Sequence, residues 1–237
     1  MRTMGYAAGA LSLAASLAFA GPAQAGGWHH GHDDDDAQLS VLHGVPGLTV
    51  DVWVNGTLTL DDFKPGTLAG PLELPGGDYR IAITAADATS ADNPVIGPVD
   101  VELDDGGNYT AVAHLTADGT PTASLFENDT KAPRNDKKGK LTVRHVAAAP
   151  AVDVLAGGQP VIEDLSNPDE ATLKLKAGTI SAAVAAAGTT TPVLGPTDVT
   201  VEAGKNTIVY AWGSLADGTL AVATQVVEGK DRWHGRH

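Results

Sequence analysis

The chain has no cysteine among its 237 residues, which excludes disulfides, thiol chemistry and lipid attachment through cysteine. Aromatic residues make up only 5% of it, and 15 basic residues face 29 acidic ones, for a net charge of −14. This negative balance argues against nucleic acid or an anionic membrane as the main partner. Beyond a short N-terminal run, no segment is apolar over the length needed to span a membrane.

Common catalytic signatures are also missing. The sequence has no G-x-S-x-G nucleophile elbow, no H-E-x-x-H zinc motif, no phosphate-binding loop and no dinucleotide fingerprint. Its Asp and Asn residues do not have the spacing of an EF-hand. The sequence therefore predicts a protein that is not an enzyme, with no catalytic residue and no resident cofactor.

What is present begins with a segment typical of export. Arg2 precedes an apolar run at residues 7–20, and Ala23-Gln24-Ala25 has the small-x-small pattern that signal peptidase cleaves. We expect residues 1–25 to be a signal peptide and Gly26 to be the mature N-terminus. The protein would then be secreted and extracellular, either released or associated with the cell wall.

The rest of the chain contains one sequence twice. LSVLHGVPGLTVDVWVNG at 39–56 aligns with LTVRHVAAAPAVDVLAGG at 141–158, and PVIGPVDVELDDGGN at 94–108 aligns with PVLGPTDVTVEAGKN at 192–206. We expect repeat 1 at 38–130 and repeat 2 at 139–228, joined by a basic linker at 131–138 and flanked by tails at 26–37 and 229–237. Each repeat is long enough for a small core, so we expect two independently folded domains.

Both repeats are rich in short strands. In TVDVWV, Val50, Val52 and Val54 alternate with Asp51 and Trp53. Asn55-Gly56 follows this strand and accepts the positive φ angles of a hairpin turn. Gly157-Gly158 permits the same turn in repeat 2. No window has a long helical period, so the sequence predicts an all-β protein with two tandem immunoglobulin-like β-sandwich domains; a small barrel is the alternative.

Each repeat resembles domain-of-unknown-function family 4397, a secreted bacterial domain that opens with a strand, a histidine, an Ala/Pro-rich turn and an AVDV-type strand. The matching residues of repeat 1 are His43, Val50, Asp51, Val52, Val54, Asn55 and Gly56. Those of repeat 2 are His145, Pro150, Ala151, Val152, Asp153 and Val154. Repeat 1 departs from the family's Ala-Pro-Ala turn and repeat 2 from its Asn-Gly. The resemblance implies the fold and supplies no catalytic residue.

His43 and His145 hold the same position in the two repeats, and strand alternation places each on the apolar face of its strand. One interpretation pairs them with Asp51 or Asp153 as a general base and its orienting carboxylate. In the other, each imidazole bonds the backbone of the adjacent turn. We favour the second because both repeats need the same turn, and we expect both aspartates to accept hydrogen bonds at strand ends.

The aromatic residues on expected strands could form a carbohydrate-binding platform. A sandwich with so few aromatic residues needs them for its cores, and we therefore expect core positions for Trp53, Tyr109, Tyr210 and Trp212.

Charged clusters have similarly plain interpretations. We expect the pairs Asp61-Asp62 and Asp104-Asp105 to lie in solvated turns. An anionic wall polymer could bind the basic residues around the linker, although solvation is the favoured interpretation: Lys131, Arg134, Lys137, Lys138 and Lys140.

The tract GGWHHGHDDDD at 26–36 carries metal-ligand side chains, and we name as candidate ligands His29, His30, His32, Asp33 and Asp35. Neutral imidazoles bind borderline-soft cations above a pKa of about 6.5. Ordering a glycine-rich tail costs on the order of 1–2 kcal/mol per residue, which disfavours a preformed tetrahedral site. We therefore expect weak, poorly selective binding of Zn²⁺, Ni²⁺ or Cu²⁺.

These observations leave three functional hypotheses. The favoured one is an exported, non-enzymatic structural or binding module that contacts a protein or a cell-wall polymer. The second is extracytoplasmic capture of divalent metal by the His/Asp-rich termini. The third and least favoured is a hydrolase with an unrecognised His/Asp site.

Overall fold

The computed structural model describes residues 36–230 of the chain. Sixteen β-strands and no helix occupy this part, which confirms the all-β prediction. It accordingly contains no helix with the length and apolar character needed to cross a membrane.

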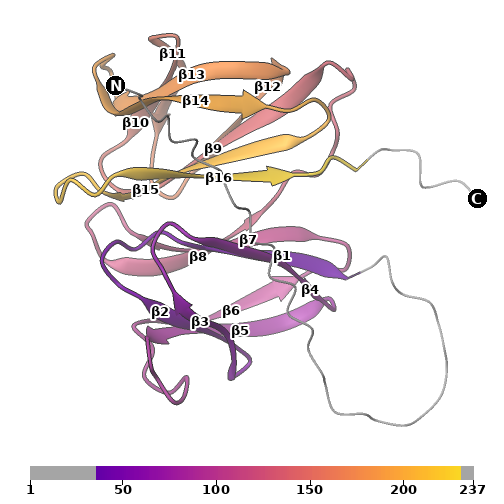
Figure 1. Ribbon diagram of the computed structural model, residues 1–237, viewed down its shortest axis with the longest axis vertical. Helices are drawn as coiled ribbons and strands as arrows, with labels where there is room; N and C mark the ends of the chain where they lie inside the picture. Colours follow the sequence, from indigo (N-terminus) through magenta and orange to yellow (C-terminus); the bar gives the residue numbers. More distant parts are fainter. Residues whose placement is uncertain (1–35, 231–237) are drawn as a thin grey trace, which may run out of the picture. The chain divides into compact units, whose positions relative to one another are not determined.

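The first eight strands form one sandwich of two four-stranded sheets (Figure 1), which we call sandwich 1. Its strands are β1 (Ala37–His43), β2 (Val50–Val54), β3 (Thr57–Phe63), β4 (Leu68–Leu74), β5 (Gly77–Ala85), β6 (Ile96–Leu103), β7 (Asn108–Leu115) and β8 (Pro121–Glu127). The strand orders are β4-β1-β7-β8 and β3-β2-β5-β6.

The second eight strands repeat this arrangement as sandwich 2. They are β9 (Lys138–Ala148), β10 (Val152–Ala156), β11 (Gln159–Leu165), β12 (Glu170–Lys176), β13 (Gly178–Ala186), β14 (Pro192–Val201), β15 (Asn206–Ser214) and β16 (Ala221–Val227). The strand orders are β12-β9-β15-β16 and β11-β10-β13-β14. The structure thus contains two tandem sandwiches, as the duplication predicts.

The place of the first strand in each sandwich departs from the seven-strand immunoglobulin order, in which the first strand lies beside the second. Here β1 pairs in parallel with β7, and β9 pairs in parallel with β15. The first strand of each sandwich therefore belongs to the opposite sheet from the second. Because the pairing is between distant segments, no local sequence signal specifies it.

The hairpin turns follow the sequence closely. Asn55 and Gly56 have φ angles of 50° and 76°, and Gly157 and Gly158 have 57° and 81°. Positive φ at both central residues is the geometry of a type I′ turn, so the predicted hairpins β2–β3 and β10–β11 are confirmed.

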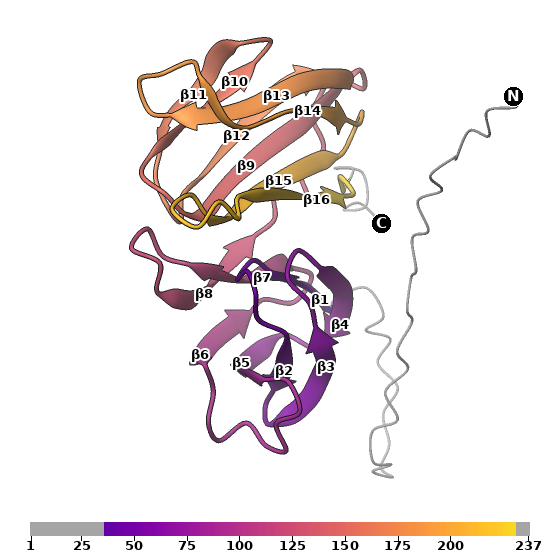
Figure 2. The same cartoon turned by 60° about the vertical axis from the view of Figure 1, so that its left-hand side comes forward.

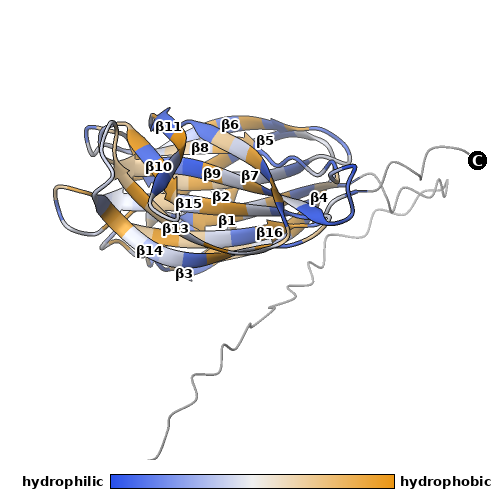
Figure 3. Ribbon diagram, turned by 90° about the horizontal axis from the view of Figure 1, so that it is seen from above, coloured by the Kyte–Doolittle hydropathy of each residue, from blue (hydrophilic) through white to orange (hydrophobic). Residues whose placement is uncertain are grey.

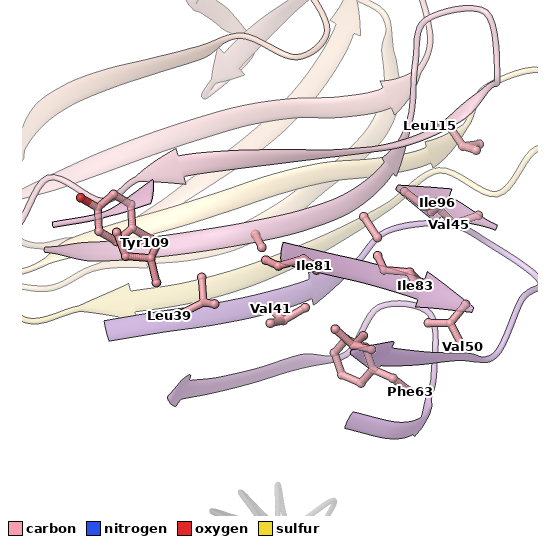
Figure 4. Packing of buried hydrophobic residues seen from close by; sticks show 14 of the residues in the cluster. Leu39, Val41, Val45, Val50, Phe63, Ile81, Ile83, Ile96, Tyr109 and Leu115 are labelled. Atoms are coloured by element: carbon pink, nitrogen blue, oxygen red, sulfur yellow. The ribbon is translucent and has the colours of Figure 1, made fainter. Parts of the chain in front are cut away.

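Alternating side chains fill both sandwiches, and hydrophobic and hydrophilic residues alternate along the strands in Figure 3. In sandwich 1, Leu39, Val41, Val50, Ile81 and Ile83 are buried between the two sheets (Figure 4). The core of sandwich 2 includes residues at the matching positions of β9 and β10, which are Leu141, Val143, Val152 and Val154.

A further cluster belongs to both sandwiches. Leu42 and Val112 of sandwich 1 pack with Ile208, Tyr210 and Trp212 of sandwich 2. Figures 1 and 2 both show β15 and β16 facing β7. We call this contact the seam. Because separating the repeats would expose its apolar residues to water, the seam argues against the expectation that each repeat folds alone.

Candidate functional site

The two histidines at equivalent positions of the repeats each hold a turn. His43 lies at the end of β1 and its Nε2 is 2.7 Å from the carbonyl oxygen of Leu48. His145 of β9 makes the same contact with Pro150 at 3.1 Å. A carbonyl only accepts, so each Nε2 carries the hydrogen. The structural interpretation of these histidines is confirmed.

Burial sets the protonation of these rings. His43 and His145 are almost wholly inaccessible, and burial lowers the pKa of each, while the carbonyl contact raises it in part. His114 of β7, which no sequence pattern singles out, is also buried, with its pKa lowered mainly by burial. It bonds Leu115 O and Ser124 Oγ, each at 2.9 Å.

The aspartates expected to orient these histidines bond backbone groups instead. Asp51 Oδ1 accepts the N–H of Asp62 at 3.0 Å. Asp153 Oδ1 accepts the N–H of Asp164 at 2.9 Å, and its Oδ2 accepts that of Gly188 at 2.8 Å. The strand-end role is therefore confirmed. Within residues 36–230, the imidazole ring of neither His43 nor His145 is hydrogen-bonded to a carboxylate, so the base-and-orienter pair is not formed there.

The acidic pair Asp61-Asp62 was expected in a solvated turn. Asp61 and Asp62 lie in strand β3 rather than in a turn, and with Asp51 they offer carboxylate oxygens within 4.8 Å of one another. Desolvation, then the charges of Asp51 and Asp62, raises the pKa of Asp61. Asp153, Glu163 and Asp164 are the corresponding residues of repeat 2, and this recurrence was the available signal. Such a cluster can attract a cation, but nothing else at the site points to one, and we assign none.

The four aromatic residues expected at core positions are all buried: Trp53, Tyr109, Tyr210 and Trp212. Trp53 Nε1 donates to Thr84 Oγ1 at 2.9 Å, which satisfies its polar atom within the sheet. The prediction of core positions is confirmed, and these rings cannot form an exposed carbohydrate platform.

The basic linker requires a correction. Lys138 and Lys140 belong to strand β9, and Lys140 is buried and ion-paired with Asp129. Lys140 therefore is not free to contact a wall polymer, because its ammonium group is already used to hold the start of sandwich 2.

A buried polar network crosses the seam, and no sequence pattern predicts it. Arg144 of β9 is 1% exposed, and its Nε donates to Glu170 at 2.6 Å. Its Nη1 donates to Asn128 Oδ1 at 2.9 Å and to Tyr210 OH at 2.8 Å. The guanidinium also lies 4.4 Å from the centre of the Phe126 ring, a favourable cation–π distance.

The network continues from sandwich 2 into sandwich 1. Tyr210 OH donates to Gln225 Oε1 at 2.6 Å, and Gln225 Nε2 donates to Ser40 Oγ at 3.1 Å. Thr110 Oγ1 donates to the same Gln225 oxygen at 3.0 Å. These bonds compensate the desolvation of the polar groups. They also fix one orientation of the two sandwiches, since each bond needs its partner at a set distance.

The predicted metal ligands His29, His30, His32, Asp33 and Asp35 lie outside the described residues, as does the expected signal peptide at 1–25. Nothing in the structure bears on them.

Comparison with known proteins gives the identity of both repeats. The family described as domain of unknown function (DUF4397) matches residues 37–155 and 139–232. A search of curated proteins gives no match to the chain. The two matches together span all sixteen strands. The chain therefore belongs to the DUF4397 family and carries two tandem copies of its domain.

Proposed function

We propose that this protein is an exported, non-enzymatic scaffold of two joined sandwiches that binds a protein or a cell-wall polymer outside the cell. The observation that carries the proposal is the use of its buried polar groups. His43, His145, Asp51 and Asp153 all hold backbone atoms of their own repeat. Side chains that hold backbone atoms in this way stabilise loops, and they are not free to activate a substrate.

Export rests on the N-terminal sequence. A basic residue, an apolar run and an Ala-Gln-Ala site support removal of residues 1–25. Sequencing the N-terminus of protein recovered from culture medium should find Gly26 first. Recovery from the cytosol alone, with Met1 intact, would defeat this part of the proposal.

Binding is tested with the secreted mature protein and envelope fractions of its own cells. We expect saturable binding that survives high salt, and protease treatment of the fraction distinguishes a protein partner from a wall polymer. Binding that rises linearly without saturation, or that vanishes at moderate salt, contradicts a specific partner.

A second function is favoured by the tract at residues 29–36, which places three histidines beside four aspartates. We propose that it binds Zn²⁺ or Cu²⁺ weakly near neutral pH. Calorimetric titration should show binding that falls as the pH drops through about 6.5, and deletion of 26–36 should remove most of it. Equal binding by both forms would place the metal in the sandwiches instead.

A further inference from the structure

The four sheets end in eight edge strands, and each edge strand has a neighbouring strand on one side only. Proteins guard such edges with charged side chains, prolines or bulges, because an unguarded edge pairs with other chains. Seven of the eight edge strands carry at least one charged residue. They are β3, β4, β6, β8, β11, β12 and β14.

Irregular backbone adds to the protection of most of these edges. Proline is present in β4, β6, β8, β11 and β14. The pairing register shifts where β3, β4, β6, β11 and β14 meet their neighbours. β12 pairs regularly with β9 but carries Glu170, Lys174 and Lys176. Each of these seven edges therefore resists the addition of a further strand.

β16 is the one edge strand of the described sandwiches with none of these features (Figure 1). Its sequence, AVATQVV, has no charged residue and no proline, and it pairs with β15 from Ala221 to Val227 without a bulge. Within residues 36–230, no backbone bond satisfies the N–H and C=O groups on its outer side. Donors and acceptors that alternate at strand spacing are complemented by the backbone of another extended segment.

Two apolar side chains stand beside this edge. Val222 and Val226 are 39% and 43% exposed. Both share a face of β16 with Thr224, which pairs with the core residue Val209. The face is thus turned toward the core of sandwich 2, whereas Gln225 on the opposite face is buried in the seam. A strand added beside β16 would cover the two exposed valines.

Sandwich 1 covers the equivalent edge. There β6 packs against β8, and Leu125 of β8 is packed against the core. β14 and β16 of sandwich 2 do not pack in this way. Glu127 of β8 corresponds to Val226 of β16 by pairing register. The two repeats therefore hold one guarded and one unguarded copy of the same strand.

The space beside β16 favours a single strand over a second copy of the chain. Leu68 of β4 packs in the seam cluster with Ala221 and Ala223 of β16, so sandwich 1 lies along one face of the sheet at this edge. Antiparallel pairing of two β16 strands would bring two such sandwiches to the same face of the joined sheet, where they would compete for space. Two chains of net charge −14 also repel each other.

We propose that β16 binds an extended segment of a partner protein, which adds a fifth strand to the sheet β12-β9-β15-β16. The segment is uncharged and free of proline, and its apolar side chains at alternate positions lie against Val222 and Val226. Its backbone supplies the donors and acceptors that complement the outer side of β16. This inference rests on the proposed binding function and names a protein as the partner instead of a wall polymer.

The test uses the full mature chain and a peptide of alternating valine and threonine with blocked ends, seven residues long to match β16. Amide NMR shifts and hydrogen exchange of residues 221–227 should respond saturably to this peptide. A control peptide carries N-methyl groups on two adjacent central amides, which removes a donor from each of its edges. It should bind about tenfold more weakly, because backbone hydrogen bonds supply the affinity of strand addition.

Three variants locate the site. Val226→Glu installs the residue of sandwich 1 and should weaken peptide binding about tenfold, since it removes an apolar contact and places a charge at the edge. Val222→Lys guards the same edge from a second position and should act likewise. Val161→Glu is the matched control, because Val161 is 41% exposed on edge strand β11, and it should leave the peptide affinity unchanged. Denaturant unfolding identifies any variant that does not fold.

Each outcome decides the proposal. Protection of β16 that the N-methylated peptide does not give, and that Val226→Glu but not Val161→Glu abolishes, supports it. Peptide binding at another edge strand, or no saturable binding, overturns it. Dimerisation of the chain that Val226→Glu abolishes also overturns it, because the edge then belongs to a second copy. Envelope binding that persists in Val226→Glu would leave the proposed function intact and exclude β16 as its site.

Discussion

At the scale of single residues, several buried polar side chains of this protein hold backbone groups. Asp153 is the clearest case, since its two oxygens accept the N–H groups of Asp164 and Gly188. Asp164 has a φ of 57°, which is costly for a residue other than glycine. The carboxylate thus anchors a strained position of the β10–β11 hairpin.

Replacement of Asp153 by alanine should lower the free energy of unfolding by about 1–3 kcal/mol, because two part-buried N–H groups lose their acceptor. Asp153→Asn keeps one acceptor and should cost less. Asp100→Ala is the control, since this carboxylate is largely exposed and pairs only with Arg80. Denaturant unfolding of the three variants measures the differences. Equal losses in Asp153→Ala and Asp100→Ala would show that the anchor contributes nothing.

The buried histidines predict the pH dependence of stability. Burial lowers the pKa of His43, His114 and His145 in the folded protein, so the unfolded chain takes up protons first as pH falls. Stability from these groups is complete above the unfolded value of about 6.5 and is lost below it toward the folded values. Each histidine contributes a slope of up to about 1.4 kcal/mol per pH unit.

Denaturant unfolding between pH 8 and pH 5.5 checks this dependence. His43→Gln should flatten the curve below pH 6.5 by removing one of the three contributions. A stability that stays constant to pH 5.5 would mean that the folded protein protonates these rings freely.

At the scale of elements, the seam joins two sheets that descend from one ancestral surface. Leu42, Val112 and Phe126 of sandwich 1 correspond to Arg144, Tyr210 and Gln225 of sandwich 2 by pairing register. At these three positions sandwich 1 is apolar and sandwich 2 is polar, and Arg144 covers the Phe126 ring. The divergence makes the contact specific for one repeat against the other.

Arg144→Leu should lower the free energy of unfolding by about 2–4 kcal/mol, since it leaves the partners Asn128 and Tyr210 without their donor. Glu170 is partly exposed, so water recovers some of its loss. Arg80→Leu breaks an exposed pair and should cost less than about 1 kcal/mol. Similar losses in both variants, measured by denaturant unfolding, would refute the importance of the seam network.

The sequence predicted features that depend on neighbouring residues. Asn55-Gly56 specifies its own hairpin, and alternation around Val50 and Val52 specifies a buried strand face. The sequence did not predict the seam, because Arg144 and Gln225 lie in segments far apart in the sequence. Taken alone, each residue is typical of a solvated surface position. The duplication also hid the difference between the two sides of the seam, because similar sequences suggest that equivalent residues have similar environments.

At the scale of the molecule, the seam makes the two sandwiches one structural unit. Beyond the Arg144 network, Asn167 of sandwich 2 donates to Leu115 O at 2.8 Å, and Asn206 donates to Asp129 O at 3.3 Å. A rigid pair presents its loops and edges at fixed separation, which lowers the entropic cost of binding a partner through both repeats.

The central claim is that the two repeats form one rigid, cooperative scaffold, and scanning calorimetry of the mature chain tests it most directly. We predict one heat-absorption peak whose calorimetric and van't Hoff enthalpies agree, as expected for a single cooperative unit. Two separable transitions, each reproduced by an isolated repeat, would contradict this account and show that the seam is a weak contact between independent domains.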